Sequence, residues 1–376
     1  MTDSSFDSPF GLIQLQRLPR RERELLRAWD AADEYLLKTV IDESLCADSV
    51  LICNDTFGAL SVALHKFHPV NWSDSLTAHK ASQQNLRENG FDESDVSNLD
   101  SLQTPLNPVD LVLCKVPKTL ALFEYQLIKL KPLLSVNSHL LVAGMAKSMP
   151  AAVWKILERI IGPTQTSRAV KKAKVIRVTV DQTLPLAKNP YPVKWKLEAT
   201  NYSITNHANV FSREKLDIGT RFLLQNLPLT EGQGDIIDLG CGNGVLGLIV
   251  ASQNKQATVH FVDESYMAVD SATVNFQQLS TESSAATFHV SDDLGDYENQ
   301  SIDLILCNPP FHQHQAVGDS VALSIFAESA RVLKAGAELW VIGNRHLNYH
   351  LKLKKFFKEV EMVNSSSKFI ILKAYN

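Results

Sequence analysis

Short apolar runs alternate with stretches of helical spacing between residues 235 and 344. The apolar runs predict five strands, at Asp235–Leu239, Thr258–Asp263, 287–290, Ile302–Cys307 and 338–343. Residues 245–252 and 267–279 have the length and spacing of helices. This alternation is typical of an α/β fold with a doubly wound, parallel sheet. The later β-rich run at 368–375 predicts an added antiparallel strand at the edge of that sheet.

The N-terminal half repeats the same plan. In three pairs of matching residues, the separation between the two members grows slowly along the chain. The pairs are Asp30 with Asp217, Asn85 with Asn275, and Asp110 with Asp303, and their separations are 187, 190 and 193 residues. Small loop insertions in a duplicated domain produce such a gradual increase. We therefore predict two tandem copies of one domain, each with a seven-stranded, mostly parallel sheet.

The boundary between the copies is predicted from turn-forming residues. Residues 181–192 carry Pro185 and Pro190 and read as a linker. The first domain then spans 1–180 and the second spans 193–376. Period-two alternation on both sides of 199–201 predicts a hairpin at the start of the second domain.

Composition narrows the class of protein. A chain of 376 residues, with 45% hydrophobic and 21% charged residues, fits a globular enzyme with two cores. We expect a cytoplasmic protein without membrane contact, because no signal peptide or long apolar span is present. The five cysteines are widely spaced, so we expect neither a disulfide framework nor a metal site. A net charge of -4 argues against bulk coating of nucleic acid but allows a local basic surface.

A glycine-rich turn joins the first predicted strand of the second half to a helix. Its candidate cofactor-binding residues are Asp238, Gly240, Cys241, Gly242, Asn243 and Gly244. Such a turn lets an adenosine-containing ligand lie against the backbone. The spacing of Gly242, Gly244 and Gly247 also fits a nicotinamide-binding fingerprint, so a dehydrogenase stays open at this point.

Acidic residues follow the next two strands. Asp263 stands 23 residues after Gly240 (263 against 240), where a carboxylate can accept hydrogen bonds from ribose hydroxyls. Its alternative role is to cap the following helix. We include the adjacent Glu264 among the cofactor-binding candidates. Asp292 is placed to accept a hydrogen bond from the adenine amino group, and Asp293 competes with it.

The tetrapeptide after the fourth strand distinguishes a methyltransferase from a dehydrogenase. It consists of Asn308, Pro309, Pro310 and Phe311, our candidate catalytic residues. An exocyclic base amine is a poor nucleophile because its lone pair is delocalised. The Asn308 side-chain oxygen and the Pro309 carbonyl can each accept one N–H and so direct the lone pair. Phe311 offers a face for the base to stack on.

The first copy lacks these groups. Where the second copy has its glycine turn, the first has residues 52–58 and keeps only the final glycine. Where the second copy has the tetrapeptide, the first has Lys115, Val116, Pro117 and Lys118. We predict that the first domain is catalytically inactive.

With these motifs the chain resembles the ribosomal RNA guanine 2-amino methyltransferases, most closely those of the large subunit. The matching segments are 206–213, 216–217, 238–244, 262–264, 307–311 and 344–346, together with 29–37 and 115–122. The resemblance covers nearly the full length. It implies class I methyltransferase domains, a degenerate N-terminal copy, and S-adenosylmethionine-dependent methylation of one guanine in 23S ribosomal RNA. It also implies that Phe211 lies over the cofactor pocket.

The sequence gives weaker evidence for the residues that contact the substrate. Four basic residues near the end of the first domain are candidates for RNA phosphates: Lys171, Lys172, Lys174 and Arg177. They also fit the solvated face of an edge strand. The target base must be unpaired or flipped out. We expect protein-free 23S RNA as the substrate and a monomeric enzyme.

Two further readings stay open. The tetrapeptide presents the same acceptors to an adenine 6-amino group or to a glutamine side-chain amide. A non-catalytic RNA-binding assembly factor is the alternative from another class.

Overall fold

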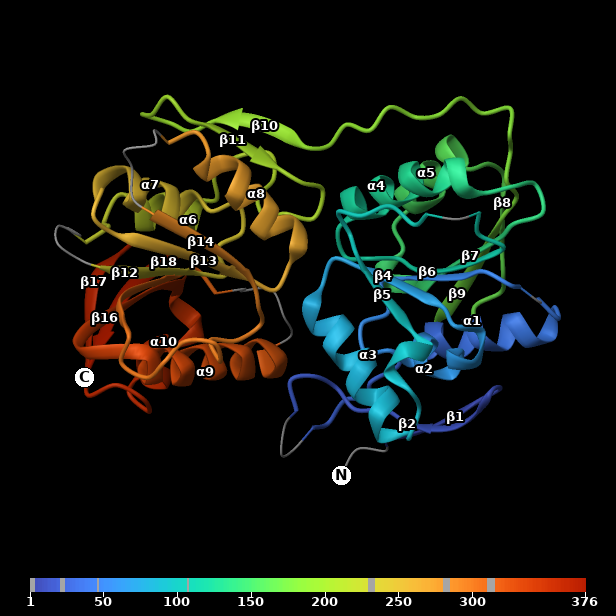
Figure 1. Cartoon of the computed structure of the whole chain (residues 1–376), viewed down its shortest axis with the longest axis horizontal. Coiled ribbons are helices and arrows are strands. Elements are labelled where there is room, and N and C mark those ends of the chain that lie inside the picture. The colour runs from blue at the N-terminus through green and yellow to red at the C-terminus, as the bar shows by residue number, and fades with distance from the viewer. Residues whose placement is uncertain are drawn as a thin grey trace. The chain divides into compact units, whose positions relative to one another are not determined.

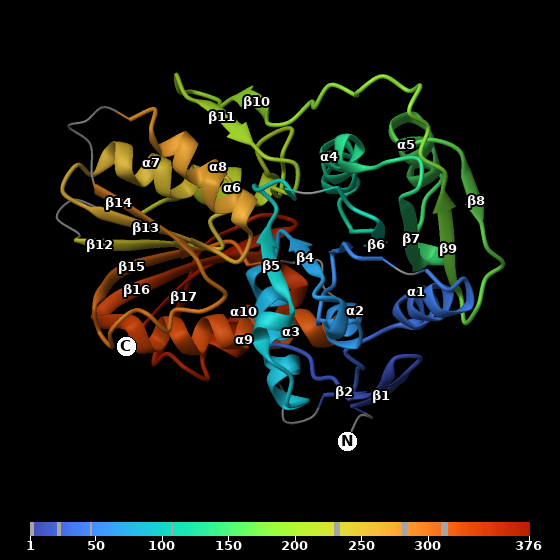
Figure 2. The same cartoon turned by 45° about the vertical axis from the view of Figure 1, so that its right-hand side comes forward.

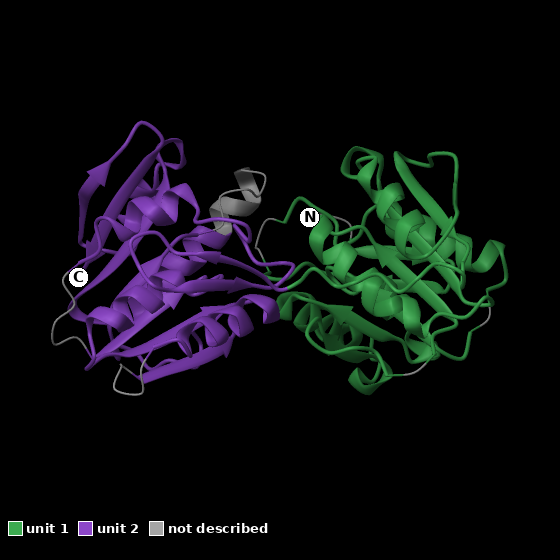
Figure 3. Cartoon of the chain, turned by 90° about the horizontal axis from the view of Figure 1, so that it is seen from above, with its two compact units in different colours: residues 1–191 green, residues 192–376 purple. Residues whose placement is uncertain are grey.

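The computed structural model divides into two compact units, Met1–Tyr191 and Pro192–Asn376 (Figure 3). It describes residues 4–20, 24–45, 47–106, 108–228, 234–279, 285–309 and 315–376, with side chains in the last range from residue 321 onward. The stretch predicted as a linker carries a turn at 182–184 and no helix or strand before the second unit begins. Within the described ranges, no helix is both long enough and apolar enough to cross a membrane.

Each unit begins with a hairpin and continues with one mixed sheet and its helices (Figure 1). The strands of the first unit are β1 Ser5–Ser8, β2 Gly11–Gln14, β3 Val50–Cys53, β4 Val70–Ser73, β5 Ser97–Asp100, β6 Leu111–Lys115, β7 His139–Met145, β8 Thr164–Thr166 and β9 Ala173–Val178. Its helices are α1 Ala31–Asp42, α2 Ala59–Ala63, α3 Leu76–Glu88, α4 Leu120–Leu130 and α5 Ala152–Ile160.

The second unit runs through the same succession of elements. Its strands are β10 Val193–Lys196, β11 Ser203–Asn206, β12 Asp235–Leu239, β13 Thr258–Asp263, β14 Ala285–Val290, β15 Ile302–Cys307, β16 Leu333–Asn344, β17 Glu359–Ser365 and β18 Phe369–Tyr375. Its helices are α6 Ile218–Leu224, α7 Val245–Gln253, α8 Tyr266–Phe276, α9 Gln315–Val332 and α10 Tyr349–Leu353.

The two seven-stranded sheets share one topology. Their strand orders are β5-β4-β3-β6-β7-β9-β8 and β14-β13-β12-β15-β16-β18-β17. In each sheet the first five strands pair in parallel and the last two join antiparallel. The predicted fold class is therefore confirmed, including the mostly parallel sheets of both copies.

One strand prediction was wrong in its position. The C-terminal strand β18 is not the edge of the sheet, because it lies between β16 and β17. Phe369, Ile371 and Leu372 are buried, as suits an internal strand, whereas β17 carries the exposed Glu359 and Glu361. The edge strand is β17, since charged side chains there discourage further strand pairing.

Helices cover both faces of the second sheet (Figures 1 and 2). Helices α6, α7 and α8 lie on one face, and α9 and α10 lie on the other. Ile236 and Ile237 are neighbours in β12, yet they belong to different cores. Ile236 belongs to the cluster that contains Val250 of α7, and Ile237 belongs to the cluster that contains Phe326 of α9. The continuous apolar runs of the central strands follow from this burial on both faces.

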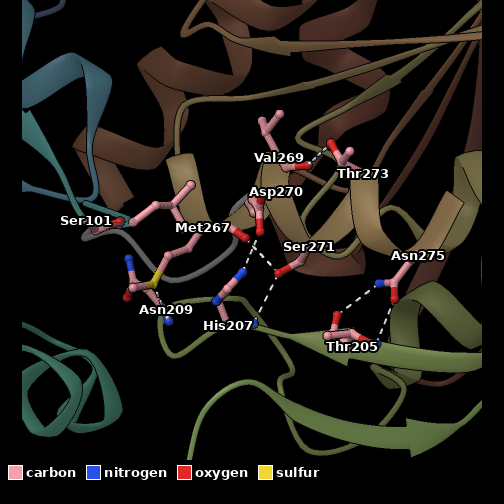
Figure 4. A network of polar contacts seen from close by, with 12 residues as sticks. Ser101, Thr205, His207, Asn209, Met267, Val269, Asp270, Ser271, Thr273 and Asn275 are labelled. Atoms are coloured by element: carbon pink, nitrogen blue, oxygen red, sulfur yellow. Dashed lines mark hydrogen bonds and ion pairs between the residues drawn. The ribbon is translucent and has the colours of Figure 1, made fainter. Parts of the chain in front are cut away.

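A buried asparagine ties the hairpin of the second unit to the glycine turn, and Figure 4 shows its bonds to Thr205 of the hairpin. Asn275 of α8 donates from Nδ2 to the backbone carbonyls of Thr205 and Asn243, both at 2.9 Å, and its Oδ1 accepts the Thr205 N–H at 2.7 Å. The side chain is fully buried. Hairpin, turn and helix are therefore held by three hydrogen bonds to one amide group.

Asn85 makes the same three bonds in the first unit. Its Nδ2 donates to the carbonyls of Gln16 and Phe57, at 2.9 and 2.8 Å, and its Oδ1 accepts the Gln16 N–H at 2.9 Å. A pattern kept in such detail on two matched asparagines supports duplication. These hydrogen bonds also fix the position of each unit's hairpin relative to the turn between the first strand of its seven-stranded sheet and the following helix.

Replacing Asn275 with alanine should destabilise the second unit by about 2–3 kcal/mol, because it leaves three buried backbone groups without partners. Hydrogen exchange during urea unfolding, resolved by peptide, measures the two units separately. The matched variant Asn85→Ala should lower protection in the first unit instead. Equal losses in both units from either variant would contradict this assignment.

Candidate active site

The glycine turn begins where β12 ends, and three of its residues have left-handed backbone. The φ angles of Gly240, Gly242 and Gly244 are 68°, 55° and 73°. A Cβ on Gly244 would lie 2.7 Å from the Ala272 Cβ, so this glycine allows α7 and α8 to pack closely. A Cβ on Gly240 or Gly242 would meet no described atom within 4 Å. The backbone at these two positions is therefore open to close approach by a ligand.

Asp238 lies beneath this turn rather than on its surface. Its side chain is 1% exposed, and its Oδ2 accepts the Gly247 N–H of α7 at 2.8 Å. Burial, together with the nearby charge of Asp263, raises the pKa of Asp238 to about 7 despite that hydrogen bond. Gly247 itself has a packing role, because a Cβ there would lie 2.4 Å from the Phe261 ring.

Asp263 holds the turn against the end of β13. Its Oδ2 accepts the Gly242 N–H at 2.9 Å, and its Oδ1 accepts the Ser265 N–H at 3.0 Å. The N-cap of α8 is Ser265, whose hydroxyl accepts the Ala268 N–H. The alternative of Asp263 as the helix cap is therefore wrong. Glu264 is exposed at the same end of the strand.

Asp292 and Asp293 follow β14, and both are exposed. The loop is tied beside β13 by a hydrogen bond from the Ser291 N–H to the Asp263 carbonyl at 2.9 Å. Asp293 accepts the Gly295 N–H at 2.9 Å, so its carboxylate stabilises its own turn. The adenine contact at Asp292, with Asp293 as its competitor, stays a prediction.

Asn308 follows β15, and its two side-chain polar atoms have different environments. Nδ2 donates to the Thr220 hydroxyl at 2.9 Å, whereas Oδ1 is buried and has no hydrogen-bond partner among the described residues. Pro309 beside it is buried. Pro310 and Phe311 lie outside the described residues.

The orientation of the Asn308 amide follows from a chain of contacts. Asp217 caps α6 by accepting the Thr220 N–H at 2.9 Å, and the Thr220 hydroxyl lies 3.4 Å from the same carboxylate oxygen. A carboxylate only accepts hydrogen bonds, so the hydroxyl hydrogen points to Asp217 and its lone pairs face Asn308. The NH₂ group of Asn308 must then face Thr220, which directs Oδ1 away from it.

Parallel pairing brings these groups to one edge of the sheet. Leu239 at the end of β12 is level with Val262 of β13 and with Cys307 of β15. Their successors are the glycine turn, Asp263 and Asn308. The carboxyl edge of such a sheet is the usual ligand site in doubly wound folds.

The remaining turn residues have structural partners. Asn243 donates from Nδ2 to the Asn206 side-chain oxygen at 2.9 Å. Cys241 and Cys307 are buried thiols, and burial raises the pKa of both. Within the described part of the chain, no cluster of three or more His, Cys, Asp or Glu residues could hold a metal ion.

Phe211 lies on the segment between β11 and α6, and its side chain is 52% exposed. The start of this segment is tied to α8 (Figure 4). The His207 N–H donates to the Ser271 hydroxyl at 3.1 Å, and the imidazole lies 2.6 Å from the Asp270 carboxylate. The role of Phe211 over a cofactor stays a prediction.

The basic residues of the first unit are partly engaged with acids. Lys171 pairs with Glu34 at 2.6 Å, and Arg177 pairs with Glu43. Lys174 lies over the Trp154 ring. Strand β9, which carries Lys174 and Arg177, is next to the edge strand β8 and is not itself an edge.

Sequence reasoning missed the role of Thr220. The available signal was weak, because a threonine three residues after Asp217 looks like the ordinary start of a helix. Its contact with Asn308 spans 88 residues along the chain.

Two family descriptions match the chain. The RLMG N-terminal domain matches residues 3–182, and the methyltransferase small domain matches residues 201–373. Ribosomal RNA large subunit methyltransferase G of Pseudomonas paraeruginosa is 47% identical over 371 residues, which is 98% of this chain and 99% of that protein. The protein of the same name from Streptomyces griseus is 43% identical over 378 residues, 98% of each chain.

Among solved structures, the chain is similar to the T. thermophilus 16S rRNA N2 methyltransferase RsmC, determined in complex with AdoMet and guanosine. The TM-score is 0.78, with 21% identity over 99% of this chain and 97% of that chain. At this identity the likeness establishes the fold, with both units included.

Asp238→Asn should change how stability depends on pH. A folded-state pKa near 7, above the ordinary 3.8, means that the native protein holds this proton more tightly than the unfolded chain. The resulting stabilisation is complete below about pH 4 and is lost as the pH rises through about 7. The variant keeps an acceptor for the Gly247 N–H without this titration. At pH 8 it should be more stable than the wild type, on the order of 1–3 kcal/mol.

Urea titrations between pH 4 and 8 measure this difference. Glu264→Gln, which neutralises an exposed carboxyl at the same end of the sheet, serves as the control and should retain the wild-type profile. An Asp238→Asn profile parallel to the wild type would show that Asp238 is ionised throughout the range.

Proposed function

The chain belongs to the ribosomal RNA large subunit methyltransferase G family, and from this membership we propose that it transfers a methyl group from S-adenosylmethionine to the exocyclic 2-amino group of a guanine in 23S ribosomal RNA. The observation that carries the proposal is the Asn308 amide. Its oxygen is buried, lacks a hydrogen-bond partner among the described residues, and is directed by Thr220. A buried acceptor left without a donor is costly unless a ligand supplies one.

The residues at the carboxyl edge fit S-adenosylmethionine. Gly240 and Gly242 leave the backbone of the turn open, and Asp263 ends the adjacent strand at the position that suits ribose hydroxyls. Asp292 would accept from the adenine amino group, and Phe211 would cover the bound molecule. The remaining members of the proposed cofactor site are Asp238, Cys241, Asn243, Gly244, Glu264 and Asn308. When bound, the cofactor supplies an activated methyl group on a positively charged sulfur.

The protein's contribution to the reaction is to position the amine. Asn308 Oδ1 accepts one N–H of the base amine, and the Pro309 carbonyl accepts the other. With both hydrogens engaged, the nitrogen lone pair is directed at the methyl group instead of into the ring. These acceptors act with little reorganisation, because Thr220 and the proline ring hold them in place. Pro310 and Phe311 complete the proposed catalytic set by stiffening the loop and stacking on the base.

The choice of guanine in large-subunit RNA is supported by the relatives. The similar proteins from Pseudomonas and Streptomyces are named for the large-subunit ribosomal RNA, and the similar solved structure is an N2 methyltransferase with bound guanosine. An adenine 6-amino group or a glutamine amide would engage the same two acceptors. The target guanine must be unpaired or flipped, and protein-free 23S RNA presents such a base to a monomeric enzyme most readily.

The first unit is proposed to bind RNA without catalysis. Lys115 replaces Asn308 there, and the loop that contains Gly58 lacks the other two glycines of the turn. Phosphates are proposed to contact the basic residues Lys171, Lys172, Lys174 and Arg177. Binding at Lys171 and Arg177 would exchange their present carboxylate partners for phosphates.

Deleting the gene should lower the 2-methylguanosine content of 23S ribosomal RNA, measured by mass spectrometry of nucleosides. Restoring the wild-type chain should return the modification, and purified protein should methylate RNA from the deletion strain. Unchanged 2-methylguanosine with loss of 6-methyladenosine would replace guanine by adenine as the target. If assembled subunits are methylated as well as protein-free RNA or better, the proposed substrate form is wrong.

Asn308→Ala should retain methyl-donor binding and lose turnover by about 10²-fold or more, because one preorganised acceptor is removed. Calorimetry measures the binding, and methyl incorporation into RNA measures the turnover. Asn364→Ala, an exposed asparagine of the same unit, is the control. A non-catalytic assembly factor would show no turnover in the wild type.

Thr220 can be tested within the same experiment as a positioning residue. Thr220→Val removes the hydroxyl that accepts from Asn308 and should lower kcat about 10- to 100-fold with a smaller change in KM. Thr220→Ser keeps the hydroxyl and should restore most of the activity. Equal activity of the two variants would show that Thr220 has only a packing role.

A further inference from the structure

The first unit contains a pocket at the place that corresponds to the proposed active site. Its volume is about 110 Å³, and Asp33, Asp55, Lys115, Arg17 and Arg27 are among its lining residues. At ~30 Å³ for each water molecule, this space would hold several waters or one planar ring. Its lining residues Asp33 and Lys115 correspond in sequence to Thr220 and Asn308 of the second unit.

The change at this position replaces a neutral pair by an ionic one. Asp30 caps α1 as Asp217 caps α6. Asp33 takes the position of Thr220, three residues after the cap, and Lys115 takes that of Asn308. The Lys115 ammonium lies 2.7 Å from Asp33 and 3.2 Å from Asp30. These ionic groups replace the hydroxyl and amide of the second unit, so this pocket presents different chemistry.

The turn after β3 also contains an acidic residue, which the matching position in the second unit lacks. Asp55 is 1% exposed, and its Oδ2 accepts the Leu60 N–H, the Ser61 N–H and the Ser61 hydroxyl at 2.8–3.0 Å. Gly58 keeps the left-handed backbone of Gly244, with a φ of 81°. The turn therefore retains its shape while presenting a carboxylate where the second unit has Cys241.

Two carboxylate oxygens of residues that line this pocket are buried and have no hydrogen-bond partner among the residues that the structure describes. They are Oδ1 of Asp33, whose residue is 2% exposed, and Oδ1 of Asp55. Each belongs to a carboxylate whose other oxygen is fully engaged. Burial raises the pKa of both carboxyls, to about 6 for Asp33, because the ionised form loses its hydration. Buried acceptors of this kind are stabilised when a ligand donates N–H groups to them. The pocket is thus equipped for a ligand with adjacent donors.

We propose that this pocket binds an unpaired guanine of the RNA substrate, whose ring N–H and 2-amino group donate to Asp33 and Asp55. Guanine presents two neighbouring donors on its pairing edge. Adenine and cytosine place a single amino group beside a ring acceptor, and uracil places its N–H between two carbonyls. Unpaired bases are commonly recognised by hydrogen bonds along this edge. The proposal rests on the proposed RNA substrate and names what the first unit recognises.

The arginines at the pocket suit the rest of a nucleotide. The Arg17 guanidinium lies 4.4 Å from the Phe57 ring centroid and donates to the Arg27 carbonyl at 3.1 Å. The Arg27 guanidinium lies 5.2 Å from the Trp29 ring centroid. These contacts hold two planar cations near the pocket, where they can meet phosphate or stack on a neighbouring base.

The test uses the full chain with guanosine monophosphate as the probe, and adenosine and inosine monophosphates for comparison. Hydrogen exchange resolved by peptide separates this pocket from the catalytic site. Guanosine monophosphate should protect amides in residues 24–37 and 54–61. The adenine nucleotide should not protect them, and the inosine nucleotide, which lacks the 2-amino group, should protect them less.

Asp55→Asn provides the matching variant, because its amide oxygen can keep the three structural bonds while its NH₂ replaces the free acceptor by a donor. It should weaken nucleotide binding at the pocket at least 10-fold. Asp42→Asn, on the exposed end of α1, is the control. If Asp55→Asn fails to fold, the comparison of guanine with inosine in the wild type still decides.

Equal protection by the adenine nucleotide, protection confined to residues 192–376, or unchanged affinity in folded Asp55→Asn would each overturn the proposal. Methylation of 23S RNA is measured separately. Failure of guanine binding in the first unit is therefore distinguishable from failure of the proposed function.

Discussion

Parallel register between β12 and its neighbours β13 and β15 is the constraint on which the second unit depends. Because Leu239 is level with Val262 and Cys307, the three strands end together. The glycine turn, Asp263 and Asn308 consequently meet at one edge. Asp263 then joins two of these strand ends by accepting the Gly242 N–H. A shift of one residue in any of these pairings would turn the following side chains to the opposite face.

The two units show which parts of this arrangement belong to the fold and which to the chemistry. Asn85 and Asn275 make the same three hydrogen bonds, so the clamp between hairpin, turn and helix is a requirement of the architecture. The polar side chains at the carboxyl edge of the two sheets, by contrast, have diverged. In one unit the Asn308 amide donates to the Thr220 hydroxyl, and in the other Lys115 pairs with Asp33. A common scaffold therefore supports two different polar surfaces at the same edge.

In both units, buried polar groups at the carboxyl edge of the sheet lower the stability of the fold. Asp238 and Asp55 are buried acids that hold the start of the following helix, and burial raises the pKa of each. The Oδ1 atoms of Asn308, Asp33 and Asp55 add a further cost, since each is buried without a donor in the part of the chain that the structure describes. Unsatisfied polar groups of this kind are expected where a ligand completes the hydrogen bonding.

The sequence by itself determined the duplicated α/β fold and the positions of the parallel strands in the second sheet, because buried parallel strands appear as continuous apolar runs. It also singled out the glycine turn, Asp263 and Asn308, because they directly follow such runs. Tertiary structure decided the order of the last two strands, since pairing partners are chosen by burial over long separations. It showed that Ser265 caps α8, which left Asp263 to hold the glycine turn. It also decided the direction of the Asn308 amide, because that direction depends on Thr220, a residue 88 positions away along the chain.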